Sequence, residues 1–138
     1  MKTKCFAPTN ALILYYSTTK EDKLIIGYYL EKEFEPAPQV EGTSGAGLRW
    51  LTDNGSSKYF FMRHVIIEEG GAIGLHEHPY EHQVFITKGK GKCIVEGREY
   101  ELSEGCYALV PGGVVHCFVN TGKGPLEFIC CINRVDNS

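Results

Sequence analysis

The chain has 138 residues, 43% of them hydrophobic, and a formal net charge of −3 at neutral pH. This length allows one domain with a substantial core. The small acidic excess offers no basic surface for nucleic acid or anionic lipid, and no run approaches the roughly 20 apolar residues of a membrane-spanning helix. We therefore expect a small-molecule substrate, with no nucleic-acid partner and no membrane.

The first 40 residues are interpreted as an extension ahead of the main domain. Two apolar segments, residues 10–17 and 23–34, flank a polar loop, and a glycine and a tyrosine pair in the second segment favour two strands. A helix is the alternative, because Thr18 and Glu21 have the spacing of a capping box.

The rest of the chain has the pattern of a β protein. Residues 41–47, rich in glycine and serine, are expected to form a loop. From residue 58 onward, short apolar segments alternate with glycine-containing turns, which is typical of an all-β sandwich or barrel. The first strand is expected to stop at residues 69–71, Glu-Gly-Gly, and residues 96–97 are expected to form a turn. The expected strands cover residues 59–68, 83–87, 92–95, 98–102, 106–110, 114–119 and 126–133.

The six cysteines bear on the cellular compartment. They form no C-x-x-C pair, and most lie within apolar segments, where free thiols behave as small hydrophobic side chains. Cys130 and Cys131 are adjacent, so in a strand only one of them faces the interior. The apolar run at residues 11–16 is too short for a signal peptide. We therefore expect free thiols in a cytoplasmic protein.

Four of the five histidines have a spacing that indicates a metal site. His76 and His78 are two residues apart, so on a strand their side chains would point to one face, about 7 Å apart. His82 opens the next apolar segment after a short turn, in a hairpin-like arrangement, and His116 opens a later one. Inside a small barrel, imidazoles from two neighbouring hairpins can converge on one divalent cation.

These residues resemble the two sequence motifs of the cupin superfamily. The first motif is similar to the spacing of Gly70, His76, His78, His82 and Gly89. The second is matched at every position by Gly105, Pro111, Gly113, His116 and Asn120. His82 stands where most cupins carry glutamate, so the chain resembles the small single-domain cupins that bind manganese through four histidines.

The resemblance implies a fold, a cofactor and an assembly. It implies a cupin-type double-stranded β-helix, or jelly-roll barrel, over residues 41–138, with residues 1–40 as a strand extension. It implies one divalent metal ion, manganese by analogy; Fe, Ni, Zn and Cu stay open because imidazole suits them and manganese ranks lowest in affinity. It also implies a homodimer, in which the apolar residues 12–16 and 24–30 are candidate contacts.

The third metal ligand is ambiguous from the sequence. His82 and Gln83 both lie at an eligible distance after His78, but neighbouring strand residues point to opposite faces, so only one of them can reach the ion. The interval from His82 to Gly89 matches the cupin motif, which favours His82, and Gln83 is the alternative ligand.

Four further residues are candidates for binding the substrate. Arg63 would orient an anionic group, although a strand arginine more commonly pairs with a surface acid. Tyr80 and Phe128 would line the pocket, although core packing is the usual role of such side chains. Cys130 would place a thiol near the metal if its side chain faces inward. No residue is assigned as catalytic.

The predicted donor set suggests a function. Four neutral imidazoles would leave a bound cation its full charge of +2, and octahedral coordination would leave two adjacent positions open. We therefore expect a metal-dependent oxidoreductase of dioxygenase or peroxide-using type that acts on a small enol, alkene or anionic molecule. The alternatives are a non-redox isomerase or sugar-acid-processing enzyme, in which a neighbouring base moves a proton, and a protein that binds a small molecule without turnover.

Overall fold

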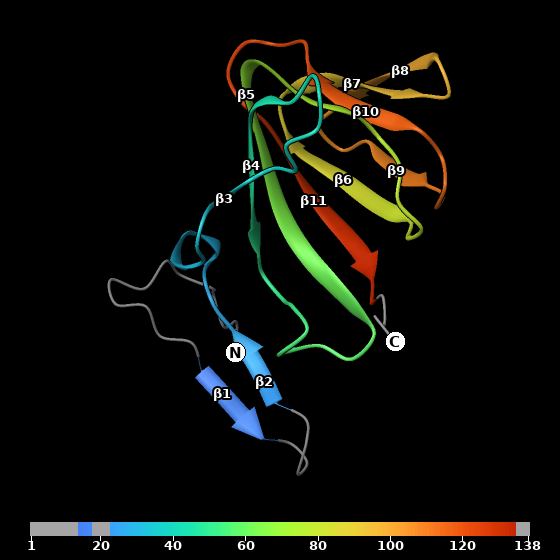
Figure 1. Ribbon diagram of the computed structural model, residues 1–138. Helices are drawn as coiled ribbons and strands as arrows, with labels where there is room; N and C mark the ends of the chain where they lie inside the picture. Colours follow the sequence, from blue (N-terminus) through green and yellow to red (C-terminus); the bar gives the residue numbers. More distant parts are fainter. Residues whose placement is uncertain (1–13, 18–22, 135–138) are drawn as a thin grey trace.

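The computed structural model describes residues 14–17 and 23–134 (Figure 1). Regular structure in these residues is almost entirely β, which confirms the all-β prediction, and none of their helices is long and apolar enough to cross a membrane. One short 3-10 helix, η1, covers Tyr29–Glu31. The strands are β1 (Leu14–Ser17), β2 (Lys23–Ile26), β3 (Glu35–Pro36), β4 (Ser44–Trp50), β5 (Phe60–His76), β6 (His82–Lys88), β7 (Lys90–Val95), β8 (Arg98–Ser103), β9 (Tyr107–Val110), β10 (His116–Asn120) and β11 (Leu126–Asn133).

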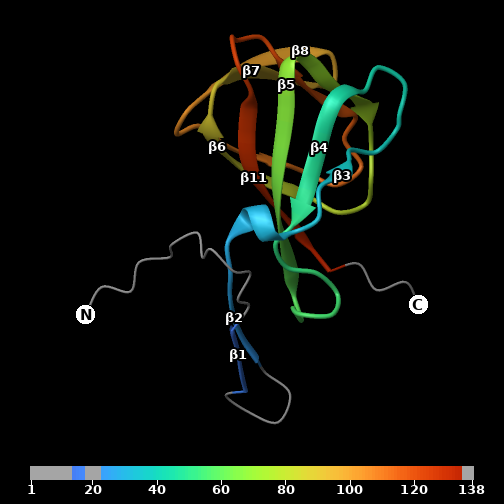
Figure 2. The same cartoon turned by 90° about the vertical axis from the view of Figure 1, so that its left-hand side faces the viewer.

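The main sheet is antiparallel and curls on itself, so that one face encloses the core (Figures 1 and 2). Its strand order is β8-β7-β10-β5-β11-β6-β9, and β4 pairs with β5 outside this path, with β3 beyond it. β5 and β6 are consecutive in the chain, but β11 lies between them and pairs with both. The segment around the first three histidines therefore connects strands that are not paired with each other, and the hairpin-like arrangement expected there is wrong.

β5 is much longer than expected and does not stop at residues 69–71. It bends there, since Gly70 has a φ of +77°. It also changes its pairing partner: before the bend Ile67 pairs with Leu126 of β11, and after it Ala72 pairs with Val119 of β10. A Cβ atom on Gly71 would lie 2.7 Å from the carbonyl oxygen of Ser44. The glycines are therefore needed for the bend and for the close approach of β4, whose pairing with β5 shifts register between Ile67 and Ala72 as at a β-bulge.

The expected loop at residues 41–47 is also partly wrong, because β4 begins at Ser44. Backbone pairing with β5 forms this strand regardless of its small side chains. Gly47 is required there, because a Cβ atom at this position would collide with the ring of Phe34.

The predicted tight turn between residues 95 and 98 is confirmed. Val95 pairs with Arg98, and both turn residues have positive φ, +49° at Glu96 and +80° at Gly97. This is the backbone of a type I′ turn, whose twist matches that of the strands it joins.

The N-terminal strands form a separate two-stranded sheet that stands apart from the barrel in both views (Figures 1 and 2). The strand interpretation agrees with β1 and β2, while the second segment turns into η1 after Ile26. Thr18 and Glu21, the residues of the alternative helix cap, lie outside the described residues, as do residues 10–13.

The core continues directly into the interior where the histidines lie. Burial alternates along β6 and β11, so that Val84 and Ile86 face inward on the same side as His82, and Phe128 faces inward on the same side as Cys130. Cys130 is fully buried and Cys131 only partly, as expected for neighbours on a strand, and the five cysteines of the described residues are free thiols.

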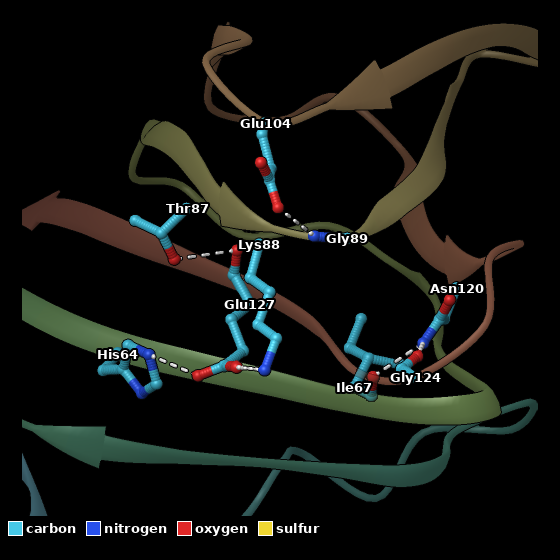
Figure 3. Close-up of polar contacts among 9 residues, drawn as sticks. All are labelled: His64, Ile67, Thr87, Lys88, Gly89, Glu104, Asn120, Gly124 and Glu127. Carbon is cyan, nitrogen blue, oxygen red and sulfur yellow. Dashed lines mark hydrogen bonds and ion pairs between the residues drawn. The ribbon is translucent and has the colours of Figure 1, made fainter.

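Two motif residues, Asn120 and Gly89, stabilise or form turns at the ends of strands (Figure 3). Asn120 donates its side-chain amide to the carbonyl oxygens of Ile67 and Gly124, at 2.9 Å each, which ties the end of β10 to the bend of β5. Gly89, at φ +86°, turns the chain between β6 and β7.

Gly71→Ala should lower the free energy of unfolding by about 1–3 kcal/mol, because the added methyl group meets backbone oxygens that cannot move independently of the sheet. Gly55→Ala is the matched control, since its Cβ would meet only the exposed carboxylate of Asp53, at 3.3 Å. Urea denaturation of both variants measures the difference, and equal midpoints would contradict the close-approach argument.

Candidate metal centre

The structure brings the four predicted histidines together at one end of the barrel interior. His76 is the last residue of β5 and pairs with His116, the first residue of β10, while His82 begins β6. His78 lies beyond the end of β5, in the connection to β6, so its expected place on the same strand as His76 is wrong. One ring nitrogen from each of the four side chains falls in a group whose members all lie within 4.8 Å of one another.

Backbone carbonyls determine which nitrogen of three rings faces the centre. The Nδ1 atom of His76 lies 2.7 Å from the carbonyl oxygen of Gly74, and that of His116 lies 2.8 Å from the oxygen of Val114. The Nδ1 atom of His78 lies 2.7 Å from the oxygen of Tyr80. A carbonyl oxygen can only accept, so each Nδ1 carries the proton, and each Nε2 keeps its lone pair.

His82 is oriented by a side chain and not by a backbone carbonyl. Its Nδ1 lies 3.0 Å from the sulfur of Cys130, on the neighbouring strand β11. The sulfur thus lies where a carbonyl oxygen lies at the other three rings, and it orients His82 with its Nε2 directed toward the cluster. A thiol both donates and accepts hydrogen bonds, so this contact fixes the orientation of the ring and not the position of its proton.

The donor set fits a divalent cation. The Nε2 of His116 is buried and has no hydrogen-bond partner. The Nε2 atoms of His78 and His82 lie 2.5 Å apart, a separation that requires a proton or a cation between them. A cation bound by the four Nε2 atoms would satisfy all of these groups at once.

The environment keeps the rings in the neutral form that a metal requires. Burial, followed by the nearby Arg63 guanidinium, lowers the pKa of His82 from 6.5 to about 2. Burial likewise lowers the pKa of His78 and of His116. At neutral pH these three rings therefore need no deprotonation before they bind a cation.

A cavity of about 50 Å³ adjoins the cluster. The residues that line it include His76, His82 and all four candidates for substrate binding: Arg63, Tyr80, Phe128 and Cys130. The ring of Tyr80 also stacks on the ring of His78, with centroids 3.9 Å apart. The candidates therefore lie where a molecule bound next to the cluster would contact them.

Arg63 faces the interior and does not pair with a surface acid. Its side chain is 6% exposed, its Nη2 donates to the sulfur of Cys130 at 3.0 Å, and its guanidinium lies 5.3 Å from the centroid of the Trp50 ring. Burial raises the pKa of the Cys130 thiol, against the influence of Arg63, so the sulfur brings no compensating negative charge at neutral pH.

Gln83 lies outside the cluster. Its side chain is exposed on the opposite face of β6, where its amide donates to the carboxylate of Glu81 at 2.9 Å. The remaining histidine, His64, is also separate from the cluster and contacts Glu127 through Nε2 at 3.2 Å (Figure 3).

Sequence reasoning missed the groups that orient the rings. Gly74 and Val114 each lie two residues before a histidine and act through their carbonyl oxygens, which every residue has, so no residue type marks them. Trp50 was also missed, because its contact with Arg63 depends on the pairing of β4 with β5.

The chain is similar to known proteins in both sequence and fold. A family model described as "Cupin domain" matches residues 63–132, from β5 to β11. A mannose-1-phosphate guanylyltransferase of Escherichia coli is 35% identical over 72 residues; the match covers 51% of this chain and only 15% of that protein. Among solved structures, the polyketide cyclase RemF of Streptomyces resistomycificus has a TM-score of 0.71 at 19% identity, over 80% of each chain. A cupin 2 conserved barrel domain protein of Rhodopseudomonas palustris has a TM-score of 0.67 at 22% identity, over 91% of this chain and 83% of that one.

Replacing His82 by alanine should weaken binding of one equivalent of Mn²⁺ at least 100-fold. Mutation of residues that only support a metal ligand typically lowers metal affinity about 10- to 100-fold, and this variant would lose a ligand itself. Gln83→Ala should leave the affinity within about twofold of that of the unmodified protein, since this side chain faces away from the cluster. Isothermal titration calorimetry measures both variants. Loss of binding in the Gln83 variant with retention in the His82 variant would reverse the assignment.

Proposed function

This chain belongs to the cupin family, and we propose that it is a metal-dependent oxidoreductase of dioxygenase or peroxide-using type that acts on a small enol, alkene or anionic molecule. The observation that carries the proposal is the cluster of four imidazole donors with no carboxylate among them. A divalent ion held there would keep its charge and act as a Lewis acid, and a redox-active ion would also exchange electrons with dioxygen or peroxide. We propose manganese as this ion, by the resemblance to four-histidine cupins.

The residues around the cluster have supporting roles in this proposal. The carbonyl oxygens of Gly74, Tyr80 and Val114 hold three rings in position. Phe118 and Phe128 are almost completely buried beside the cavity and exclude water from it. Arg63 offers hydrogen-bond donors to an anionic substrate.

The cavity lining favours metal-centred oxidation over a proton-transfer reaction. None of the described residues that line the cavity is an aspartate or glutamate. A non-redox isomerase would need a base within hydrogen-bond reach of the substrate, and the histidines are committed to the cluster. The alternative functions are a non-redox isomerase or sugar-acid-processing enzyme and a protein that binds a small molecule without turnover.

The free thiols support a cytoplasmic location as part of the proposal. The five cysteines of the described residues are free, and three of them, Cys93, Cys117 and Cys130, are buried. Unpaired thiols are typical of a reducing compartment.

Protein purified without chelator or nickel resin, and assayed by elemental analysis, should contain about one equivalent of a redox-active metal. We expect it to consume dioxygen or peroxide with a member of a panel of small diketones, enols and alkenes. An alkene that takes up both atoms of one dioxygen molecule would be cleaved into two carbonyl products. His116→Ala should abolish this consumption and Gln83→Ala should retain it. Isomerisation of a sugar acid, or ligand binding without oxidant use, would contradict the proposal.

We also propose that the protein is a homodimer. Leu24 and Ile26 of β2 are each 42% exposed, on a two-stranded sheet that would be marginal in water alone. On the outer face of the barrel, Phe85 and Tyr107 are paired across β6 and β9 and are 50% and 84% exposed. The apolar strand β2 of one copy is complementary to this face of a second copy.

Light scattering at micromolar concentration should give twice the chain mass of 15.4 kDa. Replacing both Leu24 and Ile26 by aspartate should shift the mass to that of a monomer, because burying two carboxylates in an apolar contact is unfavourable. A monomeric mass for the unmodified protein would rule out the dimer.

A further inference from the structure

The guanidinium of Arg63 is a buried cation that the protein itself leaves incompletely satisfied. Arg63 pairs in register with Trp50 on one side and with Cys130 on the other, which places its side chain inside the barrel. Its Nη2 bonds the Cys130 sulfur, but its Nε–H is buried and has no hydrogen-bond partner. Among the described residues, no carboxylate forms an ion pair with it.

Such an arrangement is unfavourable unless something else completes it. Removing a charge from water is costly unless the charge is paired and its hydrogen-bond donors are used. The Trp50 ring offsets part of the cost, because a cation is attracted to the face of an indole. The ring accepts no hydrogen bond in the plane of the guanidinium, so the Nε–H stays available.

Arg63 also opens onto the same cavity as the histidine cluster. The lining contains His76, His82 and Arg63 and, among the described residues, no acidic side chain. A bound divalent cation and the guanidinium would together make the cavity strongly positive. A ligand that enters it is therefore selected for negative charge.

The shape of the guanidinium favours one class of anion, the carboxylates. The Nε–H and the Nη2 group lie along one edge of the guanidinium, and this edge matches the two oxygens of a carboxylate. The cavity volume of about 50 Å³ leaves space for only a few non-hydrogen atoms, since a single water needs about 10–15 Å³.

We propose that this cavity is the binding site of a small carboxylate of about the size of pyruvate, and that Arg63 is the residue that binds its charged group beside the histidine cluster. The inference deepens the proposed function and rests on it, because it takes the bound anion to be the molecule on which the metal centre acts. Arg63 has a binding and positioning role here, and it is distinct from the four metal ligands.

Calorimetric titration of the Mn²⁺-loaded protein with pyruvate and with butane-2,3-dione tests the proposal. The two molecules are similar in size and both offer adjacent oxygens, but only pyruvate carries a carboxylate. We expect pyruvate to bind at least tenfold more tightly. Arg63→Gln should reduce that advantage severalfold, to the part that the metal ion alone supplies, and leave the affinity for the dione within about twofold. Arg63→Lys, which keeps the positive charge but loses the paired N–H donors of the guanidinium, should be intermediate.

Arg49→Gln is the matched control. Arg49 lies on β4, one residue from Trp50, but its side chain packs over the Phe34 ring at 5.1 Å and donates to the carbonyl oxygen of Lys32. This variant should bind both molecules as the unmodified protein does. Elemental analysis of each variant should show an unchanged metal content, which separates loss of the anion site from loss of the metal.

Equal affinities of the unmodified protein for pyruvate and the dione would overturn the proposal, and this comparison does not depend on the folding of any variant. Undiminished pyruvate binding by a folded Arg63→Gln protein would also overturn it. Failure of the proposed oxidoreductase activity can be distinguished from failure of the anion site. If no member of the panel is oxidised while the Arg63-dependent preference for pyruvate persists, the anion site is supported and the oxidoreductase proposal is contradicted.

Discussion

The site depends on hydrogen bonds that fix the Nδ1 side of each imidazole. Three of these bonds go to backbone carbonyl oxygens and the fourth contact goes to the Cys130 sulfur, so four Nε2 atoms are directed toward one volume. The Nε2 atoms of His78 and His82 are too close for two facing lone pairs, and the buried Nε2 of His116 has no protein partner. A barrel that holds its rings in this way has the geometry of a cation site before any cation binds.

The backbone can hold this arrangement because β5 is continuous. Its N-terminal half pairs with β4 and β11, which places Arg63 inside the barrel between Trp50 and Cys130. Its C-terminal half pairs with β10, which places His76 opposite His116. The bend at Gly70 and Gly71 connects the two halves, so one strand positions both the histidine cluster and the arginine that we propose to bind an anion.

Charge distinguishes this site from a generic buried cluster of polar residues. Burial and Arg63 keep His82 neutral, and burial keeps the Cys130 thiol protonated. No acidic side chain lies among the described lining residues. The charge of a bound cation and that of the guanidinium are therefore left for the ligand to balance, and this connects the oxidoreductase proposal with the proposed preference for a carboxylate.

The sequence by itself determined the β class, the turn at residues 96–97 and the set of histidines that meet, because alternation of side chains, positive-φ turn residues and motif spacing are local properties. Alternation also implied that His82 and Gln83 face opposite sides, and the structure shows Gln83 on the outside. The course of β5 through residues 69–71 was not predictable, since glycine both ends strands and allows them to bend, and only the pairing with β4 and β10 decides between the two. The carbonyl oxygens of Gly74 and Val114 were not predictable either, because they are backbone atoms common to all residues. Arg63 was a candidate from the sequence, but only the register of β5 with β4 and β11 decided that its side chain lies inside the barrel and not at the surface.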